Sequence, residues 1–229
     1  MKRRGCYRRV RLWQAAVLGL PLALQMPMAP RADEVAITPD LESLTVHHGS
    51  REIEIRRNQD TGAMVDFDYA LTSRACPPYC IQPMTISAGV ETIGEIELLR
   101  ALQRRAQENP GTLLIDSRTQ EWVSRGVIPG AVNIPWTELH PTEADPKRVA
   151  ERLELDFGAV RRGPIWDFSQ AKTLILYCNG PWCGQSPTNI RALLNLGYPA
   201  SKLKWYRGGM QSWVSLGFPR ITPDGEVVY

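Results

Sequence analysis

Residues 173–187 read Thr-Leu-Ile-Leu-Tyr-Cys-Asn-Gly-Pro-Trp-Cys-Gly-Gln-Ser-Pro, and this stretch indicates the architecture of the chain. Its first five residues form a short apolar run rich in β-forming side chains, which predicts a buried strand. Ser186 and Pro187 are typical of a helix N-cap and first turn, and Gly197 is typical of the position past a helix end. Cys178 is therefore expected in a loop that leads from a strand into a helix.

Cys178 occupies a position that favours reactive chemistry. In an open α/β sheet, ligands bind where a strand ends and the next helix begins, and the unpaired N–H groups there favour an anion. A thiolate is an anion, so such a loop can lower the pKa of a cysteine and make it nucleophilic. The alternative is a small buried side chain without chemistry, because free cysteine is among the most buried residue types.

From residue 92 onward, helical and strand patterns alternate. Thr92 and Glu95 have the spacing of a capping box, which predicts a helix that continues through Leu102. Further strands are expected at residues 112–115 and 203–206, with helices at residues 120–124 and 146–155 and around Trp213. This alternation predicts an α/β fold with a mostly parallel sheet covered by helices on both faces.

The preceding part, residues 33–92, is rich in turns and is expected to form a small β-rich segment. Residues 44–47 and 51–55 flank a short turn and predict a hairpin, and residues 64–69 alternate in polarity as a strand does. The segment also contains Cys76-Pro77-Pro78-Tyr79-Cys80, in which the two prolines stiffen the turn and remove two backbone donors.

Residues 1–32 have the pattern of a secretory signal peptide, with a basic start and then an apolar stretch. Seven of the 27 Lys and Arg residues lie there without any acidic residue, which leaves 20 basic against 24 acidic groups in the remainder. That balance argues against a nucleic-acid-binding face. We expect a periplasmic or secreted protein with no stable membrane insertion after cleavage; a retained anchor is the alternative, which the prolines of the stretch disfavour.

Four cysteines remain once the leader that contains Cys6 is removed. Exported proteins favour disulfides, and the short separations make the local pairs, Cys76 with Cys80 and Cys178 with Cys183, the expected ones. The first pair is expected to be structural, with a relay partner as the alternative. The second pair could cycle between dithiol and disulfide, although a structural or incidental thiol at Cys183 is the alternative. The spacings do not match a zinc knuckle, so we expect no metal, and nothing indicates an organic cofactor.

The order of these segments resembles the rhodanese family of sulfurtransferases. The matching pieces are residues 113–118, residues 126–135, the strand-cysteine-helix unit at residues 173–196, and residues 205–213. The chain is thus similar to an exported bacterial rhodanese-like protein with an N-terminal extension. The resemblance implies a rhodanese-like domain over residues 93–219, preceded by the segment at residues 33–92 and followed by a C-terminal tail at residues 220–229.

What the family implies is sulfur transfer through a cysteine persulfide to a thiol or cyanide acceptor. By motif position the nucleophile is Cys178, and Asp116 and Arg118 are supporting residues, interpreted mainly as a structural pair that ties loops together. Cys183 is a candidate resolving or redox cysteine. The anion-binding loop consists of Asn179, Gly180, Trp182, Gly184, Gln185 and Ser186. The expected partners are a small sulfur donor or a persulfide-carrying protein, together with a thiol reductant.

The loop departs from the family pattern because it is longer and carries no Arg or Lys. It must hold a dianion such as thiosulfate with backbone N–H groups and the helix dipole alone, which predicts weak use of thiosulfate. Two alternatives to a sulfurtransferase therefore stay open, a non-catalytic binding module and a thiol-disulfide redox protein. A phosphatase is disfavoured, since it needs an Arg five or six residues after its cysteine, where this chain has Cys183 and Gly184.

Overall fold

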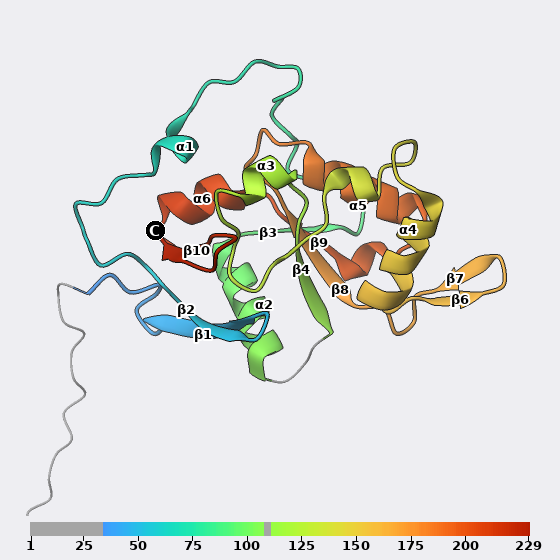
Figure 1. Cartoon of the computed structure of the whole chain (residues 1–229), viewed down its shortest axis with the longest axis horizontal. Helices are drawn as coiled ribbons and strands as arrows, with labels where there is room; N and C mark the ends of the chain where they lie inside the picture. Colours follow the sequence, from blue (N-terminus) through green and yellow to red (C-terminus); the bar gives the residue numbers. More distant parts are fainter. Residues whose placement is uncertain (1–33, 108–110) are drawn as a thin grey trace, which may run out of the picture. The chain divides into compact units, whose positions relative to one another are not determined.

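A five-stranded sheet forms the centre of the molecule. Its strand order is β3 (Glu91–Ile93), β9 (Leu203–Tyr206), β8 (Thr173–Tyr177), β4 (Thr112–Asp116) and β5 (Val132–Asn133). All neighbouring strands run parallel, so the predicted α/β class with a parallel sheet is confirmed (Figure 1). This computed structural model describes residues 34–107 and 111–229.

Alternate side chains of the central strands enter two separate cores. Leu114 of β4 packs in one core with α2 (Glu95–Gln107) and α6 (Gly209–Ser215). Its neighbours Leu113 and Ile115 pack in the other core with α5 (Gln185–Asn195). Because both faces of the strands are buried, their sequences read as continuous apolar runs, and helices cover both faces of the sheet as predicted.

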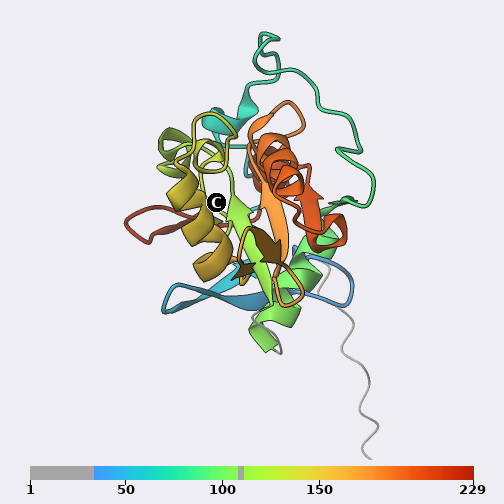
Figure 2. The same ribbon diagram turned by 90° about the vertical axis from the view of Figure 1, so that its right-hand side faces the viewer.

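The predicted N-terminal hairpin is present and packs on the first core. Strands β1 (Ser43–His48) and β2 (Arg51–Arg56) pair antiparallel around a turn in which Gly49 has a φ of 60°. Leu44, Val46, Ile53 and Ile55 are buried in the cluster that contains α2. The hairpin lies beside α2 in both views (Figure 1, Figure 2).

Two local predictions in the N-terminal half are wrong. The strand expected at residues 64–69 is replaced by the short helix α1 (Phe67–Ala70), because Met64 and Phe67 are 91% and 90% exposed and no sheet receives them. The capping box is also shifted. Thr92 lies in β3, and the carboxylate of Glu97 instead accepts a hydrogen bond of 3.1 Å from the N–H of Gly94, directly before α2.

The helix expected at residues 146–155 begins as predicted, with the Asp145 carboxylate accepting from the N–H of Lys147 at 2.9 Å. It is regular only through α4 (Pro146–Glu151) and widens into a π-helical turn, η2 (Arg152–Asp156). The remaining elements are α3 (Gln120–Val123), η1 (Trp136–Glu138), η3 (Ala200–Lys202) and the small hairpins β6 (Val160–Arg162) with β7 (Ile165–Asp167) and β10 (Arg220–Ile221) with β11 (Val227–Val228).

The signal peptide expected at residues 1–32 lies outside the described residues. Across residues 34–107 and 111–229, no helix combines the length and the apolar character that crossing a membrane requires.

Candidate functional site

Cys178 directly follows the central strand β8, and its backbone is held by the start of α6. The Cys178 carbonyl oxygen accepts a hydrogen bond of 3.0 Å from the N–H of Met210, and the Asn179 carbonyl accepts one of 2.8 Å from Gln211. Gly209 has a φ of 58°, and a β-carbon there would collide with the Cys178 carbonyl oxygen. Only glycine therefore allows α6 to approach the loop this closely.

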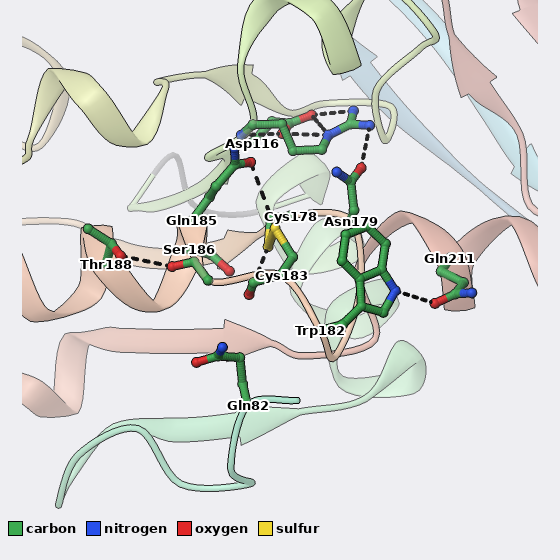
Figure 3. The surroundings of a disulfide bond; sticks show 12 residues. Gln82, Asp116, Cys178, Asn179, Trp182, Cys183, Gln185, Ser186, Thr188 and Gln211 are labelled. Atoms are coloured by element: carbon green, nitrogen blue, oxygen red, sulfur yellow. Dashed lines mark hydrogen bonds and ion pairs between the residues drawn. A yellow bond between two sulfur atoms is a disulfide. The ribbon is translucent and has the colours of Figure 1, made fainter. Parts of the chain in front are cut away.

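The structure joins Cys178 and Cys183 by a disulfide, with their Cα atoms 6.3 Å apart. A turn closes the loop between them, since the N–H of Cys183 donates to the Gly180 carbonyl at 2.9 Å. The two cysteines are 2% and 3% exposed and form a small buried cluster with Trp182. Figure 3 shows this disulfide with the indole of Trp182 beside it. In this oxidised state Cys178 has no free thiolate.

The residues predicted to bind an anion line the same loop. Within the described part of the chain, the backbone N–H groups of Asn179, Gly180, Trp182 and Gly184 donate no hydrogen bond. Gln185 begins α5, so its N–H and that of the next residue belong to the first turn, which helix geometry leaves unpaired. The loop thus retains backbone donors that an anion could use.

Ser186 does not cap the helix, which corrects the N-cap prediction. The N-cap is Gly184, and Ser186 lies inside the first turn of α5. Its hydroxyl oxygen accepts a hydrogen bond of 3.1 Å from the indole N–H of Trp205, and its side chain is fully buried. The hydroxyl accepts the hydrogen bond of a buried tryptophan, so a helix start two residues earlier was not evident from the sequence.

Asp116 and Arg118 form a fully buried pair beneath the loop. The guanidinium donates to both carboxylate oxygens, at 2.9 and 2.6 Å, and also reaches the Gly126 carbonyl and the Asn179 side chain. Burial alone would lower the pKa of Arg118, but the Asp116 charge and its hydrogen bonds raise it. Burial and then Asp116 raise the pKa of Tyr177, whose hydroxyl donates to Asp116 at 2.9 Å.

This pair ties together the ends of β4 and β8, because Arg118 follows one strand and Asn179 follows the other. Its charges neutralise each other within the pair. Arg118 therefore positions the loop without giving it a net positive charge.

An N-terminal segment, which was expected to be separate from the α/β domain, lies against the Cys178 loop. We call residues 74–82 the lid segment. The Arg74 guanidinium carbon is 4.0 Å from the centroid of the Trp182 ring, and the Tyr79 ring meets the same indole edge-on at 5.5 Å. The N–H of Gln82 donates to the Pro181 carbonyl at 2.8 Å. The lid segment thus contacts both the Trp182 ring and the backbone next to it.

The lid segment contains the second disulfide, between Cys76 and Cys80, with Cα atoms 4.7 Å apart. Arg207, which follows β9, donates to the Gln82 carbonyl at 2.9 Å and fixes the far end of the segment. Sequence reasoning missed Arg74 and Gln82 as neighbours of the site. The only local signal was their position on either side of the cysteine-proline turn.

No metal centre is evident in the part of the chain that the structure describes. Across those residues, His, Cys, Asp and Glu side chains nowhere gather in a group of three or more that could hold a metal ion.

Comparison with known proteins gives a family match over the same region. The rhodanese-like domain family matches residues 99–216, which is more than half of the chain. The chain is also 28% identical over 134 residues to the HTH-type transcriptional regulator Rv0324 of Mycobacterium tuberculosis, a match that covers 58% of this chain and 48% of that protein. The chain thus spans about half the length of this curated relative.

Two solved structures illustrate the structural neighbours. SseA of Escherichia coli, described with the rhodanese fold and catalytic mechanism of 3-mercaptopyruvate sulfotransferases, is 27% identical. The match covers 54% of this chain and 43% of that chain, with a TM-score of 0.35. A human single-domain sulfurtransferase, TSTD1, is 24% identical, with 54% and 95% covered and a TM-score of 0.34.

Proposed function

The chain belongs to the rhodanese-like domain family, and from that premise we propose that it is a sulfurtransferase in which Cys178 carries sulfane sulfur as a persulfide. The observation that carries this proposal is the position of Cys178. It stands at the carboxyl end of the central parallel strand, in front of the first turn of α5, with loop N–H groups that have no acceptor among the described residues. This is where an α/β sheet places a reactive anion.

The reaction takes two steps. In the first, the Cys178 thiolate attacks the outer sulfur of a donor such as thiosulfate, the donor S–S bond breaks, and sulfite leaves with the electron pair. In the second, an acceptor thiolate or cyanide attacks the outer sulfur of the persulfide and restores the Cys178 thiolate. The persulfide is anionic, so the N–H groups at residues 179–186 would stabilise it as they stabilise the thiolate.

Oxidation controls this chemistry, because a Cys178–Cys183 disulfide removes the nucleophile. The disulfide can also arise during turnover: the Cys183 thiolate attacks the inner sulfur of the persulfide, the Cys178–Cys183 bond forms, and hydrosulfide leaves. Either way a dithiol reductant must supply two electrons and two protons before the next cycle.

Access of the donor to Cys178 also controls sulfur transfer. Cys178 is 2% exposed and packs in one cluster with Trp182, so a donor reaches it only after the Trp182 side chain moves away from Cys178. The lid segment holds Trp182 through Arg74 and Tyr79. A large donor, such as a persulfide-carrying protein, would have to displace these contacts.

A second candidate function is thiol-disulfide exchange through Cys178 and Cys183. The observation that favours it is the disulfide between them at a strand-helix junction. The Cys183→Ser variant separates the two functions, because it can still form a persulfide on Cys178 but cannot form the internal disulfide.

The test is thiocyanate formation from thiosulfate and cyanide, measured for the parent, Cys178→Ser and Cys183→Ser with and without prior reduction. A sulfurtransferase gives activity in the reduced parent, activity in Cys183→Ser without reduction, and none in Cys178→Ser. If Cys178→Ser keeps full turnover, the nucleophile assignment is wrong. If the reduced parent is inert with thiosulfate, mercaptopyruvate and glutathione persulfide, the binding-module interpretation replaces it.

We also propose that residues 1–32 direct export, so that the protein acts in the periplasm or outside the cell, where disulfides persist. Fusion of residues 1–40 to alkaline phosphatase, which is active only after export, tests this. An inactive fusion with intact protein would refute export.

A further inference from the structure

The two disulfides differ in how accessible they are. Cys178 and Cys183 are buried, at 2% and 3% exposed, so a reductant protein cannot touch their sulfurs while the loop is closed. Cys76 is exposed and Cys80 is partly exposed. Thiol-disulfide exchange requires direct attack on a sulfur atom. A reductant protein would therefore meet the Cys76–Cys80 pair first.

The two disulfides are also neighbours. Tyr79, directly before Cys80, packs its ring on Trp182, directly before Cys183, at 5.5 Å. Residues on the amino-terminal side of the two cysteines are thus in contact.

Gln82 lies between the two loops on the carboxyl-terminal side of Cys80 and Cys183. Its carboxamide nitrogen donates to the Cys80 carbonyl at 2.9 Å and would lie 3.8 Å from a β-carbon placed on Gly184, directly after Cys183. Figure 3 shows Gln82 extending toward the loop that contains the disulfide. The two cysteine loops are therefore in contact through Tyr79 and Trp182, and Gln82 lies close to the residue that follows Cys183.

We propose that Cys76 and Cys80 form a redox relay that passes electrons from an external dithiol protein to the Cys178–Cys183 disulfide. The proposal rests on the proposed function, since its product is the free Cys178 thiolate that sulfur transfer needs. It assigns the lid segment a partner of defined chemistry, a reduced dithiol protein of the thioredoxin class.

Each step of the relay is a thiol-disulfide exchange. The external dithiol reduces Cys76–Cys80 and becomes a disulfide itself. The Cys80 thiolate then attacks the Cys183 sulfur, the Cys178–Cys183 bond breaks, and Cys178 leaves as the thiolate. The Cys76 thiolate next attacks the Cys80 sulfur of the mixed disulfide and releases Cys183. The net result is transfer of two electrons and two protons to the loop, and the Cys76–Cys80 disulfide is restored.

The first experiment compares reduction of Cys178–Cys183 in the parent and in the Cys76→Ser/Cys80→Ser variant, both with Cys6→Ser, by alkylation and peptide mass spectrometry. Reduced thioredoxin is the protein reductant, and a phosphine that attacks disulfides directly is the control. A relay predicts that thioredoxin reduces the parent at least about tenfold faster than the variant, with phosphine rates within about twofold.

The sign of this effect separates a relay from a structural role. A disulfide that only orders the lid segment would shield the loop, so its loss would make thioredoxin act as fast or faster on the variant. That result overturns the relay. Because the assay reads thiol states and not sulfur transfer, an inert sulfurtransferase would leave its outcome intact.

A trapping experiment tests the same step in other variants. In the Cys6→Ser/Cys76→Ser/Cys178→Ser chain, Cys80 and Cys183 are the two remaining cysteines. Mild oxidation with diamide should give an intramolecular Cys80–Cys183 disulfide, identified by mass spectrometry of peptides prepared without reductant. Monomeric protein with both thiols free, or dimers alone, would contradict the relay. The Cys6→Ser/Cys80→Ser/Cys178→Ser chain, which retains Cys76, is the matched control and should link less efficiently.

Discussion

Two cysteine loops of similar sequence occupy different environments in this molecule. Each has a cysteine pair four or five positions apart with proline between, and each forms a disulfide. The loop that starts at Cys178 follows the central strand, is buried and is fixed to α6. The loop that starts at Cys76 lies in an irregular segment, and its first cysteine is exposed. Spacing predicts the pairing, whereas the position in the fold determines which sulfur is suited to nucleophilic catalysis.

The largest expected difference between the two loops is catalytic. Replacing Cys178 by serine should lower thiocyanate formation by about a thousandfold or more, because the nucleophile is lost. Replacing Cys76 by serine in the chemically reduced protein should leave the rate within about threefold of the parent. Equal losses in both variants would erase the distinction between the loops.

A second contrast lies in how each loop is held. The Asp116→Asn substitution leaves the buried Arg118 without its carboxylate, and we expect a loss of about 3 kcal/mol in the free energy of unfolding. The Arg74→Gln substitution removes a partly exposed cation from the Trp182 ring and should cost less than about 1 kcal/mol. Urea unfolding followed by circular dichroism measures both, and an Asp116→Asn cost below that of Arg74→Gln would refute the anchoring role.

The close approach of α6 to the Cys178 loop can be tested by comparing two glycines. Gly209 and Gly49 have almost the same left-handed backbone, with φ of 58° and 60°. Alanine at Gly49 meets no atom within 4 Å and should cost about 1 kcal/mol, from backbone strain alone. Alanine at Gly209 collides with the Cys178 carbonyl and should cost about 2 kcal/mol more. Equal costs in urea unfolding would show that the close approach does not constrain the loop.

The smallest expected effect concerns the hold of the lid segment on Trp182. In the reduced protein, Arg74→Met should increase alkylation of Cys178 by iodoacetamide about three- to fivefold, because a cation–π contact of about 1 kcal/mol is lost. Arg125→Met is the matched control, since Arg125 lies over Trp122 at 4.6 Å and pairs with Asp68. If both variants react like the parent, the lid segment does not limit access.

The sheet and the position of Cys178 could be predicted because their signals are local. The apolar run at residues 173–177 and the alternation after residue 92 depend on neighbouring residues, and the sheet that they predict is present. The helix start at Gln185 could not be predicted, because the Ser186 hydroxyl accepts a hydrogen bond from Trp205, a residue distant in sequence.

The lid segment was beyond sequence reasoning for a similar reason. Its contacts join residues 74–82 to residues 181–184, and no pattern within either stretch indicates the other. Residues 64–69 show the opposite failure, since their alternating pattern indicates a strand but no neighbouring strand receives it. Periodicity predicts an element only where tertiary packing uses the apolar face.

The central claim is that Cys178 becomes the sulfur carrier once its bond to Cys183 is opened. The most direct measurement is peptide mass spectrometry of the reduced parent after incubation with a sulfane sulfur donor and alkylation without reductant. We predict one added sulfur atom on the peptide that contains Cys178, in the parent and in Cys183→Ser. Added sulfur confined to another cysteine, or no added sulfur with any donor in a fully reduced protein, would contradict the account.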